Sequence, residues 1–200
     1  MTELFQTLER ADRDLTLLIN SFHTPFTDSV WMTFSAKTIW FPFYFAAAVY
    51  MVWRFGWKRS IFAILSIVLT IVACDQLGNL VKDTVCRWRP SYDPYMIRGG
   101  LHLLEGAGNF YGFYSAHAAN CFGFAVGSLT CMKLYDRRHK YNIYGVIVCL
   151  WALLVGLSRI FVGKHFLGDV IVGSLVGILI GWLLARIGYA LSRKFTVTLE

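Results

Sequence analysis

Long stretches without a charged side chain restrict the fold of this chain more than any other feature of its sequence. Hydrophobic residues make up 56% of the 200 residues, and the charged residues gather in short clusters between the apolar stretches. About 20 consecutive apolar residues cross the hydrocarbon core of a bilayer as a helix, and several such segments are typical of membrane proteins. The sequence therefore predicts an all-α fold, a polytopic membrane helix bundle.

We expect about five full transmembrane helices within residues 37–200, which form the core of a single predicted domain. The spans should cover about 38–53, 60–81, 115–135, 143–157 and 170–191. Small residues recur every four positions in the third span (Ser115, Ala119, Gly123, Gly127, Cys131) and in the fifth (Gly173, Gly177, Gly181, Ala185). Such ridges let helix backbones approach closely, and we interpret them as packing within the bundle rather than as a dimer face. Sequence does not predict the oligomeric state.

Residues 1–36 have a different character. Apolar side chains recur there at helical spacing among charged ones, at Leu4, Leu8, Ala11, Leu15, Leu18 and Ile19. This pattern predicts an amphipathic helix lying on the membrane surface, followed by a short interfacial or re-entrant helix over about 27–35. The acidic, polar start of the chain does not resemble a cleavable signal peptide. Whether this region crosses the bilayer is left open.

The distribution of Lys and Arg orients the predicted spans. Ten basic residues fall on one side: Arg54, Lys58, Arg59, Lys133, Arg137, Arg138, Lys140, Arg186, Arg193 and Lys194. The positive-inside rule makes this side cytoplasmic, so we expect a multi-pass protein of a bacterial inner membrane with a cytoplasmic C-terminus. Six basic residues break the trend on the outer side: Lys82, Arg87, Arg89, Arg98, Arg159 and Lys164. The net charge of +7 fits cytoplasmic loops and an anionic substrate equally well, and these two explanations stay open, whereas no nucleic-acid partner is expected.

Three polar clusters fall on the outer side. In the first, Lys82 and Arg89 are seven residues apart, so a helix continuing to Arg89 would point both cations the same way, and Pro90 should end it there. Asp75 and Asn79 lie on roughly the same stripe and could orient Lys82. Two cations on one face suit a phosphate, although cations that snorkel to the interface would give the same pattern.

The second and third clusters add groups that can do chemistry. Ser115, Ala116 and His117 begin the third span, where free N–H groups and the helix dipole favour an anion and a histidine can transfer a proton. Arg159 can grip phosphate oxygens with two donors. In a helix, Asp169 would share a face with His165 and bond one ring nitrogen, which leaves the other nitrogen free to attack.

With these residues, the chain resembles the type 2 phosphatidic acid phosphatases, or lipid phosphate phosphatases, in their bacterial membrane-bound branch. The family signature is Lys-x6-Arg-Pro, then Pro-Ser-Gly-His, then Ser-Arg-x5-His-x3-Asp. The first and third parts match fully here, whereas Tyr114 and Ala116 replace the Pro and Gly of the second. Alanine retains the backbone N–H but fits poorly if the position needs a positive φ.

The resemblance implies a role for each residue. His165 would attack phosphorus and become a phosphohistidine, Asp169 would orient it, and His117 would protonate the leaving oxygen and then activate water. The phosphate oxygens would be held by Lys82, Arg89, Ser115, Ala116 and Arg159. Fixed cations can neutralise the transferring phosphoryl group, so we expect no metal or other cofactor. A zinc site formed by His117, His165 and Asp169 is the less favoured alternative.

The expected function is hydrolysis of a phosphate monoester or diphosphate on a lipid, at an active site on the outer, periplasmic face. Candidate substrates from the family's range are undecaprenyl diphosphate, placed first, lipid A, placed second, phosphatidylglycerol phosphate and phosphatidic acid. The loop 98–112, which contains Glu105, is the candidate selectivity element. A non-catalytic transporter or flippase for phosphorylated lipids is the alternative, but binding alone needs no oriented nucleophile. A vanadate-dependent haloperoxidase would share the phosphate site but would be soluble.

Overall fold

The computed structural model describes residues 2–196, and its regular structure is helical. The α-helices are α1 (Thr2–Ser21), α2 (Pro25–Ser35), α3 (Phe41–Phe55), α4 (Trp57–Val85), α5 (Pro94–Arg98), α6 (Ala116–Tyr135), α7 (Asn142–Phe161) and α8 (Leu167–Thr196). Short 3-10 turns precede α3 (Thr38–Trp40) and α5 (Pro90–Tyr92). Within residues 2–196, an isolated bridge between Trp88 and Tyr111 is the only β-pairing. The prediction of an all-α membrane bundle is confirmed.

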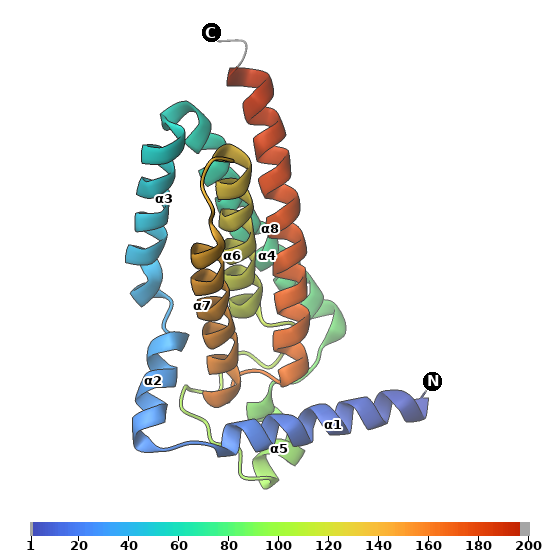
Figure 1. Cartoon of the computed structure of the whole chain (residues 1–200). Helices are drawn as coiled ribbons and strands as arrows, with labels where there is room; N and C mark the ends of the chain where they lie inside the picture. The colour runs from blue at the N-terminus through green and yellow to red at the C-terminus, as the bar shows by residue number, and fades with distance from the viewer. Residues whose placement is uncertain (1, 197–200) are drawn as a thin grey trace.

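Five helices run alongside one another to form the bundle: α3, α4, α6, α7 and α8 (Figure 1). Each predicted span falls on one of them. Among the described residues, α4, α7 and α8 are long and apolar enough to cross a membrane. Helix α3 has only 15 residues, and α6 is the least exposed of the five because it packs against α4, α7 and α8. The expected number of about five full spans stays a prediction.

Helices α6 and α8 touch through backbone. A Cβ atom added to Gly177 would lie 2.1 Å from the Ala119 carbonyl oxygen, and one added to Gly181 would lie 2.3 Å from the Gly123 carbonyl oxygen. Only glycine allows such an approach, which confirms that the small-residue ridges pack within the bundle. The contact also fixes the N-terminal end of α6 against the N-terminal end of α8, because a Cβ atom added to Gly173 would lie 2.4 Å from the Ser115 carbonyl oxygen.

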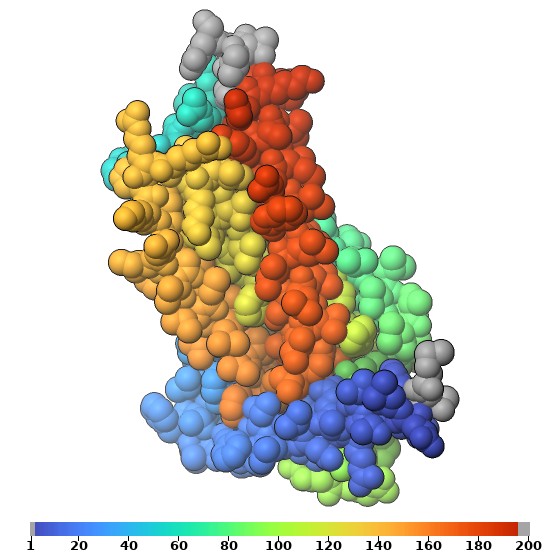
Figure 2. Space-filling model, turned by 45° about the vertical axis from the view of Figure 1, so that its right-hand side comes forward, coloured from blue at the N-terminus to red at the C-terminus, as the bar shows by residue number. Residues whose placement is uncertain are grey.

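Helix α1 lies across the end of the bundle rather than along it (Figure 1), and it covers that end of the molecule together with α2 (Figure 2). Its polarity is reversed relative to a surface helix of a soluble protein. Thr16 and Asn20 are each 1% exposed and face the bundle, whereas Leu4 and Leu8 are more than 60% exposed. An apolar face turned outward matches the amphipathic helix predicted for a membrane surface.

Helix α2 begins at Pro25, two residues earlier than the expected 27. Thr24 caps it, with its hydroxyl accepting from the Thr27 N–H, and proline is well tolerated at the first helical position. The Trp31 ring stacks on Phe161 of α7 with centroids 4.2 Å apart. This contact places Ser35, the last residue of α2, near the C-terminal end of α7.

Candidate active site

The segment from the end of α7 to the start of α8 contains the candidate nucleophile, His165, and two residues that belong to its site. Arg159 lies in the last turn of α7, and Asp169 in the first turn of α8. His165 lies in the turn and not on a helix, so the predicted helical spacing of His165 and Asp169 is wrong. The pair still forms, with 3.3 Å between His165 Nδ1 and Asp169 Oδ2. The reason is that Asp169 Oδ2 also accepts from the Phe166 N–H, which folds the turn back over the start of α8.

His165 is 3% exposed and has cations around its other ring nitrogen. Arg89 Nη1 lies 3.4 Å from His165 Nε2 and 3.3 Å from the Lys164 carbonyl oxygen. Burial lowers the pKa of His165 well below its ordinary value, and the charges of Arg89 and Arg159 lower it further. The imidazole is therefore neutral at neutral pH, which is the form that can attack an electrophile.

Arg89 lies on an extended segment and not on a helix, contrary to the prediction. Helix α4 ends at Val85, because Cys86 adopts a left-handed conformation with φ 52°, and Arg89 follows in extended backbone. Lys82 and Arg89 therefore do not share a helix face. The Arg89 N–H donates to the Phe110 carbonyl at 2.8 Å, which fixes the segment against the loop 98–112. Lys82 remains in the last turn of α4, close enough to Arg89 and Asp169 for their charges to act on it.

Asp75 and Asn79 make no hydrogen bond to Lys82 among the described residues, although Asp75 is close enough for its charge to act on the Lys82 ammonium group. Asn120 of α6 donates to Asp75 Oδ1 at 2.9 Å, and Asn79 is exposed. A stripe on one helix could not predict the Asn120 contact, because that hydrogen-bond partner comes from a neighbouring helix. Within the described residues, no hydrogen-bond acceptor contacts the Lys82 ammonium group.

The second motif forms the N-terminus of α6. Ser115 is fully buried and is the N-cap, with Oγ 3.4 Å from the Ala118 nitrogen. The Ser115 N–H donates to the Asp169 carbonyl at 3.0 Å, which joins this motif to the third one. Ala116 is the first helical residue, and among the described residues Cys86 alone of the non-glycine residues has a positive φ. Alanine thus fits, and the N–H groups of Ala116 and His117 have no acceptor inside the helix.

Arg159 is surrounded by groups that the motifs do not include. Its Nη1 donates to the Ser35 hydroxyl and lies 3.2 Å from Glu105 Oε1. Glu105 Oε2 lies 4.0 Å from Lys164 Nζ, and Ser35 donates to Glu105 as well. Burial raises the pKa of Glu105, but Arg159, Ser35 and Lys164 together lower it, so this carboxylate is ionised. Nε of Arg159 and Nε of Arg89 are buried without a partner in the described structure.

Arg87 is a site residue that the sequence reasoning counted only as an unexplained outer cation. Its Nη1 donates to Asp169 Oδ1 at 2.6 Å. A signal for this contact was present: residues two apart in extended backbone point to the same side, so Arg87 and Arg89 share a face once α4 ends early. Both arginines consequently reach the His165–Asp169 pair.

A cavity of about 230 Å³ opens between α2, α3, α4 and α6, and His117 lines it together with Ser35, Lys37, Asp75 and Asn120. Tyr44, Phe41 and Ile71 line both this cavity and an apolar groove of about 460 Å³ that follows α3 and α4. The cavity that contains His117 therefore has a few polar side chains in a largely apolar wall, and it adjoins an apolar groove along the bundle. Such a shape fits a molecule with a charged head and an apolar tail.

The alternative zinc site has no support from the geometry. Among residues 2–196, the one group of three potential ligands with closely spaced donor atoms consists of His23, Asp28 and His102. His117, His165 and Asp169 do not form such a group.

Comparison with known proteins decides the family. The family model described as "PAP2 superfamily" matches residues 61–193. The chain belongs to the PAP2 superfamily. It is 32% identical over 199 residues to a lipid A 4'-phosphatase of Bacteroides thetaiotaomicron, which covers 98% of this chain and 84% of the relative. It is 29% identical to a lipid A 4'-phosphatase of Porphyromonas gingivalis, covering 91% of this chain and 75% of that protein.

Solved PAP2 structures share the fold. The crystal structure of a transmembrane PAP2-type phosphatidylglycerolphosphate phosphatase from Bacillus subtilis superposes with a TM-score of 0.68 at 19% identity, covering 94% of this chain and 88% of that one. That of Aquifex aeolicus LpxE gives a TM-score of 0.63 at 25% identity, covering 86% and 93%. The protein is a membrane phosphatase of the PAP2 type, which confirms the family, the fold class and the enzyme class expected from sequence.

Proposed function

We propose that this PAP2-type lipid phosphatase removes the 4'-phosphate of lipid A or of a closely similar phosphorylated glycolipid. The observation that carries the proposal is the near full-length similarity to two lipid A 4'-phosphatases, which includes α1 and α2 as well as the residues matched by the family model. This reverses the order of substrates in the sequence analysis, where undecaprenyl diphosphate came first. A Bacillus subtilis phosphatidylglycerophosphatase B is also similar, but over 58% of this chain.

The reaction has two displacement steps at phosphorus. Because Nδ1 of His165 faces Asp169, Nε2 attacks the phosphorus atom, and the bond from phosphorus to the sugar oxygen breaks. His117 gives its proton to that oxygen. Neutral His117 then takes a proton from water, the resulting hydroxide attacks phosphorus, and the P–N bond breaks to release inorganic phosphate and restore both histidines.

The cations hold the phosphoryl group during both steps. Arg89 lies beside Nε2, and the unpartnered Nε groups of Arg89 and Arg159 are donors ready for phosphate oxygens. Lys82, Ser115 and the N–H groups of Ala116 and His117 complete the set, with the helix N-terminus favouring negative charge. Asp169 stabilises the imidazole and holds its orientation. No step uses a metal.

The lipid part would lie in the groove along α3 and α4, with its phosphate in the cavity that contains His117. The active site then lies at headgroup level on the periplasmic face of an inner membrane, and the C-terminus is cytoplasmic. Support comes from the positive-inside rule, because ten basic residues cluster at the ends of the predicted spans that are farther from the candidate active site. Cys86 is exposed near the site and Cys149 is half-buried on α7, so labelling of Cys86 in intact cells, with Cys86→Ser as the control, tests this orientation. Labelling only after permeabilisation would invert it.

Phosphate release by the purified protein in detergent tests the substrate and the mechanism. The panel comprises bisphosphorylated lipid A, undecaprenyl diphosphate, phosphatidylglycerol phosphate and phosphatidic acid, each with and without EDTA. We expect the highest kcat/KM on lipid A, loss of the 4'-phosphate by mass spectrometry, and unchanged rates in EDTA. Faster turnover of another lipid would reject the substrate. Turnover retained in His165→Ala, with His139→Ala as the matched control, would reject the phosphohistidine. Absence of phosphate release from every lipid of the panel would favour the non-catalytic transporter or flippase.

A further inference from the structure

Three polar residues on one face of α1 bond the turn that carries the proposed nucleophile. Asp12, Thr16 and Asn20 are four residues apart, so they lie above one another on the helix. The Gly168 N–H donates to Asp12 Oδ1 at 2.8 Å, and the Leu167 N–H donates to Thr16 Oγ1 at 2.9 Å. These N–H groups open α8, so α1 supplies the cap for another helix.

The same face of α1 also closes α7. Asn20 Nδ2 lies 3.0 Å from the Ile160 carbonyl and 3.1 Å from the Phe161 carbonyl, at the last residues of α7. Asn20 Oδ1 accepts from the His102 N–H at 2.7 Å, which ties in the loop 98–112. The turn from α7 to α8 is therefore held at both ends by a helix that precedes the region matched by the family model.

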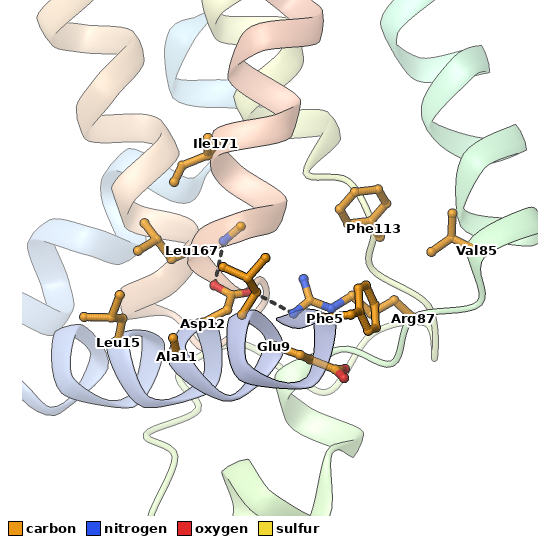
Figure 3. A pocket seen from close by; sticks show the side chains of 12 residues that line it. Phe5, Glu9, Ala11, Asp12, Leu15, Val85, Arg87, Phe113, Leu167 and Ile171 are labelled. Atoms are coloured by element: carbon orange, nitrogen blue, oxygen red, sulfur yellow. Dashed lines mark hydrogen bonds and ion pairs between the residues drawn. The ribbon is translucent and has the colours of Figure 1, made fainter. Parts of the chain in front are cut away.

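Asp12 has a second role through its other oxygen. Arg87 Nη2 donates to Asp12 Oδ2 at 2.6 Å, and Arg87 Nη1 donates to Asp169 Oδ1 at 2.6 Å. Figure 3 shows Asp12 and Arg87 facing each other across the floor of an apolar pocket of about 750 Å³ beneath α8. The Arg87 guanidinium also lies over the Phe166 ring, 4.2 Å from its centroid. Only glycine allows the approach at position 168, since a Cβ there would lie 2.8 Å from Asp12 Oδ2.

We propose that Asp12 is a positioning residue for the nucleophile, acting through Arg87 on Asp169 and thereby on His165. Asp12 engages one arm of the Arg87 guanidinium, which leaves one arm for Asp169 Oδ1 and keeps Asp169 Oδ2 for His165 and the Phe166 N–H. Without the Asp12 carboxylate, Arg87 is free to take both oxygens of Asp169, as a guanidinium and a carboxylate prefer. His165 then loses its orienting partner. This inference rests on the proposed role of His165.

The matched variants are Asp12→Asn and Asp14→Asn. Asparagine at 12 keeps the size and an acceptor for the Gly168 N–H but loses the charge that holds Arg87. We expect kcat to fall about 10- to 100-fold with KM changed less than about twofold, because alignment of the nucleophile is lost while phosphate binding is not. Asp14 lies on the same helix, and within residues 2–196 its one hydrogen-bond donor is the exposed Tyr95 hydroxyl, so Asp14→Asn should leave kcat unchanged. Asp12→Glu, which keeps the charge, should recover part of the loss.

Two further measurements separate positioning from stability and from substrate choice. Thr16→Val removes one cap of α8 but leaves the ion pairs, so it should lower Tm more than kcat. Orthovanadate, which adopts the five-coordinate geometry of the transition state, should protect the wild type from heat and protect Asp12→Asn less, whichever lipid is the substrate. Arg87→Lys and Asp12→Asn combined should lose no more kcat than the worse single variant.

The outcomes distinguish the two proposals. If lipid A is not turned over but vanadate protection still depends on Asp12, the substrate is wrong and the positioning role stands. If Asp12→Asn has wild-type kcat and wild-type vanadate protection, or if its kcat falls only in step with Tm as in Thr16→Val, the positioning role is rejected and the function stands. Absence of vanadate protection in the wild type rejects both.

Discussion

The two ends of the helix bundle each contain an arginine cluster, and the clusters differ in how completely their hydrogen bonds are satisfied. At the end formed by α3 and the turn after α6, Arg54 donates to Asp136 through Nε and Nη2. The Tyr141 hydroxyl donates to the same carboxylate at 2.7 Å, and His139 lies 3.0 Å away. At the other end, Arg89 and Arg159 each keep a buried Nε without a partner in the described structure.

The difference separates a structural cluster from a functional one. A buried donor without an acceptor costs stability, so it persists where a ligand will supply the acceptor. Around Arg54 the positive charge is neutralised within the protein by the Asp136 carboxylate. Burial raises the pKa of Asp136, but the hydrogen bonds from Tyr141 and Arg54 outweigh burial, so the net shift of this pKa is downward. Around His165 the cations outnumber Glu105 and Asp169, and a phosphate dianion would restore the balance.

The largest expected effect comes from removing one arginine from each end. Arg159→Ala should lower kcat/KM on the lipid substrate by about 10²- to 10³-fold, the usual loss for one charge-stabilising donor. Arg54→Ala should change kcat/KM less than about threefold while lowering Tm by about 2–4 °C per kcal/mol lost. Steady-state kinetics and thermal unfolding of both variants check this. Equal losses of activity would show that the two clusters do not differ in function.

Crowding beside the nucleophile should give the next effect. A Cβ on Gly112 would lie 2.9 Å from Arg89 Cγ and 3.6 Å from His165 Nδ1, so Gly112→Ala must displace Arg89. We expect kcat to fall about 10-fold or more, since small misplacements are costly in catalysis. Gly106→Ala is the control in the same loop, because nothing lies within 4 Å of its added Cβ. Comparable kcat values for the two variants would contradict the placement of Arg89.

Inorganic phosphate should stabilise one end and not the other. Phosphate bound to the free donors of Arg89 and Arg159 should raise Tm. At a phosphate concentration of 100 times Kd, binding adds about 2.7 kcal/mol to the free energy of unfolding. The shift should vanish in Arg159→Ala and persist in Arg54→Ala. A thermal-shift titration with sodium phosphate, against sodium chloride at equal ionic strength, measures it. A shift that survives in Arg159→Ala would place the anion elsewhere.

The smallest effect is a shift of the acidic limb of kcat/KM. Free histidine has a pKa of about 6.5. Because burial and then Arg89 and Arg159 lower the pKa of His165, the nucleophile stays neutral and active below that pH. Lys164→Gln removes a cation that lowers the pKa of His165, so it should move the acidic limb to higher pH. Glu105→Gln removes the negative charge that offsets Arg159, so it should lower the pKa of His165 and move the limb to lower pH. Shifts of the same sign in both variants would contradict electrostatic control of this group.

Sequence predicted the helices and the motif residues because both leave local signals. Apolar runs mark the spans, and Lys82, Arg89, Arg159, His165 and Asp169 stand at fixed spacings. It did not predict that Ser35, 124 residues before Arg159, would contact it, or that Asp12 would cap α8 from 156 residues away. A hydrogen bond between two distant segments leaves no mark in either segment that identifies its partner. The early end of α4 was also missed, because the left-handed Cys86 precedes Pro90, the visible signal, by four residues.

Helix α1 sets a limit on the smallest active fragment. A fragment chosen by motif would start near the first transmembrane helix and would contain every residue of the three-part signature. It would nevertheless lack the acceptors for the first N–H groups of α8 and the donor for the last carbonyls of α7, since Asp12, Thr16 and Asn20 supply them. The signature therefore marks where the chemistry takes place but not where the catalytic unit begins.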